Sequence, residues 1–276
     1  MLYKDWYDQA LSQLIALHGE REARSLLRVL IEDFPIKKQA FDTRAYTEAQ
    51  SALNRLLDGE PVQYICGKAY FYDSTFKVSA SVLIPRPETE ELVDHIIKTY
   101  KSQDRALSIA DIGTGSGCIA IMLKKHLPSA HVLGLDVSED ALAIARDNAV
   151  LHRTDVQFEV LDFLDERHWS GLGRQWDVIV SNPPYIPLSE RHQVGQSCLT
   201  FEPHQALFTG DRDGMEFYSA IAKFGRGRLT PNGHVFLELN EFRAAAIEQC
   251  FSGHGYQTGI IKDLSGKDRI LRCRVR

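Results

Sequence analysis

The sequence is poor in cysteine, and its cysteines do not have the spacing of a disulfide framework or of a metal site. Its five cysteines lie far apart and form no C-x-x-C pair, at Cys66, Cys118, Cys198, Cys250 and Cys273. This pattern argues against a disulfide framework and against a thiolate metal site. The ten histidines include no H-E-x-x-H motif, so we expect no bound metal.

Long apolar runs and an excess of positive charge are also missing. No stretch approaches the length of a bilayer span, and the first residues show no apolar run behind a basic cluster. We therefore expect a soluble cytoplasmic protein without membrane contact. A net charge of −5 and a pI near 6.1 give no overall attraction to a polyanion, so stable nucleic-acid binding is not expected. A monomer is the default expectation.

The 276 residues leave room for one large domain and one small one. Apolar residues recur at helical spacing in three early segments, 11–18, 23–31 and 49–57. None of these segments is long enough to be stable alone. We predict that they pack together as a small helical bundle over residues 1–66.

Residues 67–84 change to aromatic and β-branched side chains in rough alternation, which predicts a β-hairpin. Pro85 and Pro87 end it, because proline supplies no donor to a strand ladder. We take residues 67–86 as a linker and residues 87–276 as the large domain.

The large domain alternates short apolar runs with helical stretches, which predicts an α/β fold with a parallel sheet covered on both faces. The runs are 108–112, 132–136, 156–160, 177–181 and 234–239. Two further strand candidates, 256–261 and 269–274, are separated by a segment too short for a crossover helix. We expect these two to form an antiparallel pair at one edge.

A glycine-rich loop, Asp111-Ile-Gly113-Thr-Gly115-Ser-Gly117, follows the first of these strands and opens a helix. Glycine lets a ligand approach the backbone where a helix N-terminus offers free N–H groups. Nicotinamide, flavin and S-adenosylmethionine enzymes all use such loops, and a purely structural turn is the remaining alternative.

Acidic residues follow the next two strands. Asp136 ends the second strand, where a carboxylate can accept hydrogen bonds from the ribose hydroxyls of an adenosine. Asp162 and Phe163 come just after the third strand, where they can contact an adenine amino group and stack on its ring, although Asp162 fits a solvated loop equally well. The position of Asp136 suits a dinucleotide as well as S-adenosylmethionine.

The motif Asn182-Pro-Pro-Tyr185 follows the fourth strand, at the carboxyl end of the sheet beside the glycine loop. An amide nitrogen is a poor nucleophile until its N–H groups are held by acceptors. The side-chain oxygen of Asn182 and the backbone oxygen of Pro183 can supply these acceptors, while Pro184 stiffens the loop. The aromatic face of Tyr185 favours the positive charge of a sulfonium. The motif therefore indicates methyl transfer from S-adenosylmethionine to a planar nitrogen, without a strong general base.

Several motifs together closely resemble the release factor glutamine methyltransferases, also known as the HemK or PrmC family. They are Val82-Leu-Ile-Pro-Arg-Pro-Glu-Thr-Glu90, Asn182-Pro-Pro-Tyr-Ile186, Phe201-Glu-Pro203, Ala206-Leu207 and Asp213-Gly214. The resemblance covers nearly the whole chain. It implies a class I methyltransferase fold, a helical N-terminal domain that contacts the release factor, and methylation of the glutamine in the Gly-Gly-Gln loop of peptide chain release factors. The products would be N5-methylglutamine and S-adenosylhomocysteine.

Motif and resemblance together give two sets of expected site residues. The cofactor set is Asp111, Gly113, Thr114, Gly115, Ser116, Gly117, Asp136, Asp162, Phe163 and Asn182. The set that binds or activates the glutamine is Asn182, Pro183, Pro184 and Tyr185. The family often has tryptophan in place of Phe163, which keeps the stacking face but adds an indole N–H.

Two other functions fit parts of the pattern. An adenine N6 methyltransferase would use the same Asn-Pro-Pro-Tyr motif on a flipped base, but it should carry a target-recognition region or a basic face. A non-catalytic module would not need an intact glycine loop together with Asn182. The roles of Arg86, Glu88 and Glu202 stay open between ion pairing, loop support and substrate contact.

Overall fold

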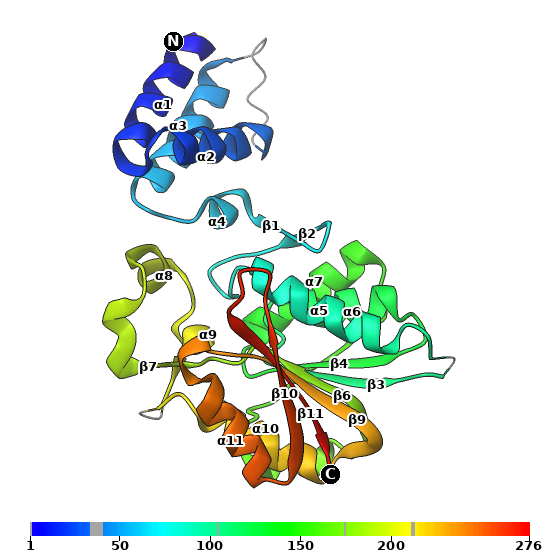
Figure 1. Cartoon of the computed structure of the whole chain (residues 1–276). Coiled ribbons are helices and arrows are strands. Elements are labelled where there is room, and N and C mark those ends of the chain that lie inside the picture. The colour runs from blue at the N-terminus through cyan, green and yellow to red at the C-terminus, as the bar shows by residue number, and fades with distance from the viewer. Residues whose placement is uncertain (1, 34–40, 104, 174, 211–212) are drawn as a thin grey trace. The chain divides into compact units, whose positions relative to one another are not determined.

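A computed structural model describes residues 2–33, 41–103, 105–173, 175–210 and 213–276 of the chain. These residues divide into two compact units (Figure 1). The first unit contains residues 1–68 together with 195–201, and the second contains 69–194 and 202–276. No feature of the sequence indicated that residues 195–201 group with the N-terminal helices.

The first unit is built from helices α1 (Tyr3–His18), α2 (Glu20–Asp33), α3 (Thr43–Leu57), α4 (Val62–Cys66) and α8 (Gln196–Phe201). The three predicted helical segments lie inside α1, α2 and α3. Their apolar faces form one core that includes Trp6, Leu14, Leu27 and Leu53. Asp42 caps α3, because its side chain accepts a hydrogen bond from the backbone nitrogen of Ala45. This unit is therefore held by one small hydrophobic core.

The predicted hairpin is present but shorter than expected. Strands β1 (Lys68–Phe71) and β2 (Ser74–Lys77) form a two-stranded sheet. The two residues between them, Tyr72 and Asp73, have positive φ angles of 49° and 56°, as a tight two-residue hairpin turn requires. Residues 78–84 are not in a strand, and a turn closed by the Val82 amide and the Ser79 carbonyl interrupts the alternation there.

A seven-stranded sheet in the order β10-β11-β9-β6-β3-β4-β5 forms the centre of the second unit. Its strands are β3 (Ser108–Ile112), β4 (His131–Asp136), β5 (Gln157–Val160), β6 (Trp176–Ser181), β9 (Leu229–Glu238), β10 (Tyr256–Lys262) and β11 (Asp268–Val275). Strands β5, β4, β3, β6 and β9 run parallel, and β11 pairs antiparallel with both β9 and β10. The predicted α/β fold with an antiparallel edge pair is confirmed.

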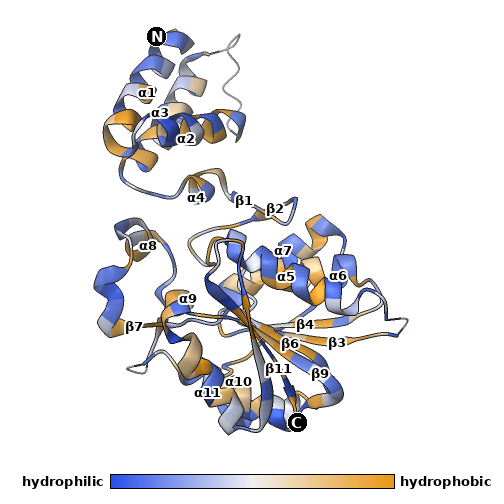
Figure 2. Cartoon of the chain, viewed as in Figure 1, coloured by the Kyte–Doolittle hydropathy of each residue, from blue (hydrophilic) through white to orange (hydrophobic). Residues whose placement is uncertain are grey.

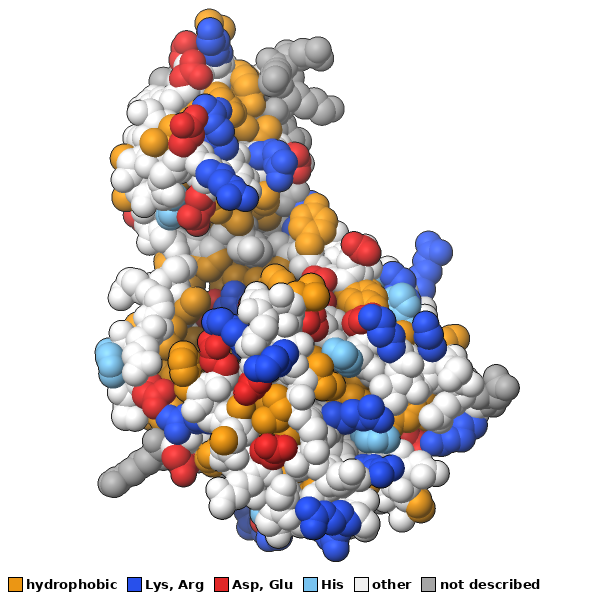
Figure 3. Space-filling view, in the orientation of Figure 1, with side chains coloured by type: hydrophobic (Ala, Val, Ile, Leu, Met, Phe, Trp, Pro, Cys, Tyr) orange, Lys and Arg blue, Asp and Glu red, His pale blue; other side chains and the backbone are white. Residues whose placement is uncertain are grey.

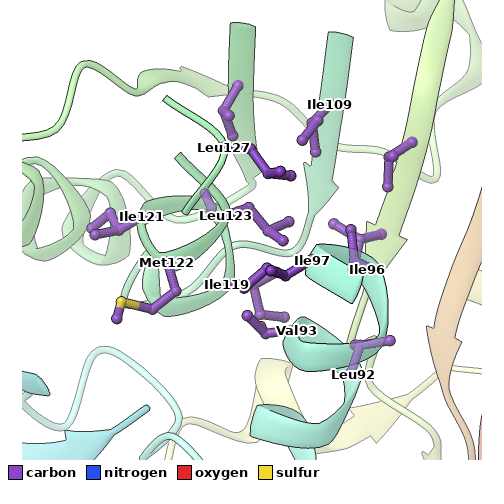
Figure 4. Packing of buried hydrophobic residues seen from close by; sticks show 14 of the residues in the cluster. Leu92, Val93, Ile96, Ile97, Ile109, Ile119, Ile121, Met122, Leu123 and Leu127 are labelled. Atoms are coloured by element: carbon purple, nitrogen blue, oxygen red, sulfur yellow. The ribbon is translucent and has the colours of Figure 1, made fainter. Parts of the chain in front are cut away.

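Helices cover both faces of this sheet (Figure 1). One face carries α5 (Pro87–Tyr100), α6 (Cys118–His126) and α7 (Glu139–His152), and the other carries α10 (Glu216–Arg226) and α11 (Ala244–Gly253). Each face buries its own hydrophobic cluster. Figure 4 shows the first cluster, where apolar side chains of α5 and α6 point toward one another beside Ile109 of β3. The inner strands are apolar along most of their length (Figure 2), because a sheet covered on both faces has no solvent side.

The second unit also contains several shorter elements. They are β7 (Ile186–Pro187), β8 (Phe208–Thr209), α9 (His204–Leu207) and the 3-10 helices Glu166–Gly171, Leu188–Gln193 and Glu241–Arg243. Strands β7 and β8 pair in parallel. Within the described part of the chain, no helix has both the length and the apolar character needed to cross a membrane.

Candidate active site

The glycine loop connects β3 to α6 and is held open toward a cavity. Gly113, Gly115 and Gly117 have φ angles of 72°, 54° and 78°, which only glycine adopts without strain. A side chain built on Gly113 or Gly115 would meet no atom within 4 Å. Both glycines border the cavity, so their missing side chains leave space beside an exposed backbone.

The cavity lies at the carboxyl edge of the parallel strands and lies wholly within the second unit. Seven of the predicted site residues line it, namely Gly113, Gly115, Asp136, Asp162, Phe163, Asn182 and Pro184. These residues come from the last position of β4 and from the loops that follow β3, β5 and β6. Parallel strands bring such loops together at one edge, which is why residues far apart in sequence share this cavity.

The backbone holds the Asp136 carboxylate in place. Its Oδ2 accepts a hydrogen bond from the amide of Gly115 at 2.9 Å, and its Oδ1 accepts one from the amide of Ser138 at 3.0 Å. Burial raises the pKa of Asp136. Each carboxylate oxygen keeps further acceptor capacity, so Asp136 can bind a pair of neighbouring hydroxyl groups without rearranging.

Asp162 and Phe163 border the same cavity but differ in burial. Asp162 is exposed, and its Oδ1 accepts a hydrogen bond from the amide of Leu164. Phe163 is buried, with its ring centroid 5.5 Å from Trp169 and 5.2 Å from Phe224. Packing against two aromatic rings fixes the orientation of Phe163, as a stacking surface for a flat ring requires.

Four predicted cofactor residues lie outside the cavity lining: Asp111, Thr114, Ser116 and Gly117. The Oδ2 of Asp111 accepts a hydrogen bond from Thr114 Oγ1 at 2.6 Å, whereas its buried Oδ1 has no partner in the described structure. Burial raises the pKa of Asp111 to about 7. The Thr114–Asp111 hydrogen bond joins the glycine loop to the end of β3, and direct contact of the four residues with a cofactor stays a prediction.

The Asn-Pro-Pro-Tyr motif begins at the residue after β6. Asn182 and Pro184 line the cavity, Pro183 is buried, and Tyr185 is packed against the hydrophobic cluster of one sheet face. Burial raises the pKa of Tyr185 to about 12, so its phenol is neutral near pH 7. The Nδ2 of Asn182 donates to the hydroxyl of Thr89 at 3.1 Å. The amide oxygen of Asn182 is then the end of the side chain that is left for a ligand.

Thr89 and Glu238 are site residues that the sequence reasoning missed. Thr89 lies in the first turn of α5, and its Oγ1 donates to Glu238 Oε2 at 2.6 Å. Glu238 ends β9, beside the end of β6 in the parallel register. The only sequence signal was position: a glutamate inside an apolar strand run, and a threonine inside the proline-rich motif before α5.

Arg86 and Glu202, whose roles the sequence left open, form an ion pair within the second unit. The side chain of Glu202 is only 1% exposed, and its Oε2 also accepts a hydrogen bond from the Ile84 amide at 3.4 Å. Glu202 therefore ties the segment before α5 to the segment after α8. Among the described residues, no group of three or more histidine, cysteine or acidic side chains is arranged to hold a metal ion.

The site suits a nucleoside bearing a positively charged group. The cavity offers an open glycine backbone, a carboxylate held by two amides and a flat aromatic residue, which match a backbone-contacting tail, a ribose and an adenine. These residues fit S-adenosylmethionine, and Asn182 adds a hydrogen-bond acceptor beside the same cavity.

Comparison with known proteins gives a consistent set of relatives. Residues 88–207 match the family model "Methyltransferase small domain". The release factor glutamine methyltransferase of Flavobacterium psychrophilum is 36% identical over 288 aligned positions that cover 100% of both chains. The enzyme of the same name from Bacteroides thetaiotaomicron is 44% identical over 81% of this chain and 79% of its own. A solved methyltransferase from Pyrococcus furiosus, 19% identical with a TM-score of 0.54, covers 82% of this chain and 100% of its own and shows the shared fold.

Proposed function

The chain belongs to the family of release factor glutamine methyltransferases, and from this premise we propose that it methylates the side-chain amide nitrogen (N5) of a glutamine in a peptide chain release factor. The methyl donor is S-adenosylmethionine, and the products are N5-methylglutamine and S-adenosylhomocysteine. The acceptor is the glutamine of the Gly-Gly-Gln loop. The observation that carries this proposal is that Asn182 and Pro184 border the same cavity as Asp136 and the glycine loop.

The cofactor half of the cavity binds S-adenosylmethionine through groups that are in place before binding. Asp136 accepts the ribose hydroxyls, Phe163 stacks on the adenine, and the amides around Gly113 and Gly115 contact the amino-acid part. Bound S-adenosylmethionine supplies a methyl group on a positively charged sulfur. A nucleophile attacks the methyl carbon, and the sulfur is the leaving group. The Tyr185 phenol is neutral near pH 7, so what it can offer the sulfonium is its aromatic face.

The acceptor half holds the glutamine amide. Asn182 Oδ1 accepts one N–H of the substrate amide and the backbone carbonyl of Pro183 accepts the other. Both acceptors are fixed before reaction, so little reorganisation is needed as charge develops on the nitrogen. The nitrogen forms a bond to carbon as the carbon–sulfur bond breaks, and it then loses one proton to solvent. No strong base is required, because the nitrogen becomes acidic only as the methyl arrives.

We propose that the bundle over residues 1–66 recognises the release factor, with residues 67–86 as the linker and residues 87–276 as the methyltransferase domain. All cavity residues lie in the second unit, which leaves the N-terminal helices free for recognition. We also propose a cytoplasmic monomer that forms no stable complex with nucleic acid. Hydrogen exchange tests the recognition role: a bound release factor should protect amides of α1, α2 or α3.

The competing function is an adenine N6 methyltransferase, because the same motif can hold an exocyclic adenine amine. Acidic and basic side chains both occur on the face of the second unit in Figure 3, and the formal net charge is −5. The deciding experiment incubates the protein with methyl-labelled S-adenosylmethionine, a release factor and duplex DNA, and locates the label by mass spectrometry. Label on the glutamine supports the proposal, whereas label on DNA adenine refutes it.

A further inference from the structure

Three side chains form a hydrogen-bonded chain that leads from the sheet interior to the cavity. Asn182 Nδ2 donates to Thr89 Oγ1 at 3.1 Å, and Thr89 Oγ1 donates to Glu238 Oε2 at 2.6 Å. Asn182 and Glu238 follow or end neighbouring parallel strands, β6 and β9, and Thr89 comes from the first turn of α5. Thr89 and Glu238 are 3% and 2% exposed, so solvent does not compete with these bonds.

The Glu238 carboxylate sets which group donates and which accepts in these two hydrogen bonds. An ionised carboxylate can only accept hydrogen bonds. When Glu238 is ionised, the Thr89 hydroxyl therefore gives its one proton to Glu238, which leaves only its lone pairs for Asn182. Asn182 therefore faces the Thr89 oxygen with its NH2 group, which donates a hydrogen bond, and not with its own oxygen. Its Oδ1 is thereby turned away from Thr89 and is the end of the amide left for a ligand in the cavity that Asn182 lines.

We propose that Thr89 and Glu238 are positioning residues that hold the Asn182 amide in the orientation that accepts a hydrogen bond from the substrate amide. This inference rests on the proposed function, because it assigns Asn182 Oδ1 to the glutamine. Neither residue is a general base. An amide group stands between them and the cavity, and it does not relay a proton at neutral pH.

The surroundings of Glu238 make this orientation sensitive to pH. Burial raises the pKa of Glu238 to about 7, with Glu88 opposing ionisation and Arg269 and Arg86 favouring it. Arg269 is shared with Asp263, to which its Nε donates. The phenol of Tyr218 donates to the backbone oxygen of Glu238 and not to its carboxylate. Tyr185 also lies close enough to feel the charge of Glu238.

Protonation of Glu238 reverses the hydrogen-bond chain. A neutral carboxylic acid can donate to Thr89, and the Thr89 hydroxyl is then free to donate to the oxygen of Asn182. That arrangement favours a flipped amide whose NH2 group faces the substrate NH2 group. Activity should therefore fall as pH drops through about 7.

The first test replaces the hydroxyl of Thr89. Thr89→Val should lower kcat roughly tenfold or more while the Kd for S-adenosylmethionine changes little, because a hydrogen bond that fixes orientation is lost. Thr89→Ser should restore most of kcat. Thr230→Val is the matched control, since Thr230 Oγ1 also donates to a buried carboxylate, Asp177, from the opposite end of β9. An unchanged kcat in Thr89→Val, or an equal loss in Thr230→Val, overturns the proposal.

The second test uses Glu238→Gln, whose side-chain oxygen can accept from Thr89 at every pH. The wild type should show kcat rising with pH through about 7, and Glu238→Gln should show no such rise. If kcat of Glu238→Gln still falls at low pH as in the wild type, Glu238 is not the group that causes the pH dependence. A readout without substrate is the NMR signal of the Asn182 side-chain NH2, which should shift with the same pKa in the wild type and stay constant in Glu238→Gln.

Failure of this proposal is distinguishable from failure of the proposed function. If the wild type methylates the glutamine and Thr89→Val does so at the same rate, only the positioning role is wrong. If the wild type places no methyl on the glutamine, the proposed function itself is wrong. In that case the NMR titration still reports whether Glu238 orients the Asn182 amide.

Discussion

At the scale of single residues, Asp136 shows how the fold prepares a polar group before a ligand arrives. Two backbone amides, those of Gly115 and Ser138, hold its carboxylate oxygens. Because Asp136 needs no rearrangement on binding, it should contribute to the affinity for S-adenosylmethionine and not to the rate of methyl transfer.

Asp136→Ala should weaken binding of S-adenosylmethionine by roughly ten- to a hundredfold, since charge-assisted hydrogen bonds contribute about 1.5–3 kcal/mol. The value of kcat at saturating cofactor should change much less. Isothermal titration calorimetry measures the affinity directly. Asp162→Ala is the control. Asp162 borders the same cavity but is exposed, so this variant should lose less affinity for S-adenosylmethionine than Asp136→Ala. Equal affinity of Asp136→Ala and the wild type would remove Asp136 from the cofactor site.

The residues that the sequence could predict are those that follow strands. Gly113, Asp136 and Asn182 each come directly after a short apolar run, and parallel topology then brings them together. Thr89 and Glu238 could not be predicted in the same way, because they lie 149 positions apart. Their pairing arises from the packing of α5 against the end of β9, which no local pattern encodes.

At the scale of elements, the loop after β6 depends on a close backbone contact with Gly214. A side chain built on Gly214 would come within 2.6 Å of the backbone oxygen of Tyr185, and its φ angle is +71°. Only glycine combines that angle with that approach. The Asp213-Gly214 motif is therefore a support for the Asn-Pro-Pro-Tyr loop.

Gly214→Ala should displace this loop and lower kcat about tenfold or more, with a loss of stability of about 1–3 kcal/mol. Gly227→Ala is the matched control, because a side chain there meets no atom within 4 Å and its φ is −100°. Steady-state kinetics and thermal unfolding of both variants measure the effects. Normal turnover in Gly214→Ala would mean that the loop does not rely on this contact.

Most elements could be predicted from sequence periodicity, and the exceptions have physical causes. Strand β9 starts at Leu229 and not at 234 as expected, because Pro231 and Gly233 interrupt the apolar run without ending the strand. The hairpin ends at Lys77 because a local turn follows. Helix α8 was not predicted at all, since six residues show no helical period.

At the scale of the whole molecule, the buried carboxyl groups link stability to pH. Burial raises the pKa of Asp111 to about 7, from an ordinary value of 3.8. Above the ordinary value the unfolded chain loses this proton while the folded protein keeps it. Asp111 therefore makes the free energy of unfolding fall as pH rises, until the folded group also ionises near pH 7.

Asp111→Asn removes this titration. Relative to the wild type, its free energy of unfolding should rise between about pH 4 and pH 7, by up to about 1.4 kcal/mol per pH unit. Urea unfolding of both proteins at a series of pH values gives this difference. His234 contributes the opposite slope below its ordinary pKa, because burial lowers its pKa to about 4, so the difference between variants is more informative than the wild-type profile. A difference that stays constant with pH would show that Asp111 is ionised in the folded protein.

The division of the chain into units was the least predictable feature at this scale. Residues 195–201 interrupt the second unit and group with the N-terminal helices, although they follow the Asn-Pro-Pro-Tyr loop closely in sequence. Sequence patterns describe neighbours along the chain, whereas a discontinuous unit is defined by contacts between distant segments.

The most direct test of the account is the rate of a single turnover by Asn182→Ala, with S-adenosylmethionine and release factor both saturating. The account predicts that methyl transfer slows by about a hundredfold or more, because the lost hydrogen bond tightens as charge develops on the substrate nitrogen, while the Kd for S-adenosylmethionine changes by only a few fold. A transfer rate equal to that of the wild type would contradict it.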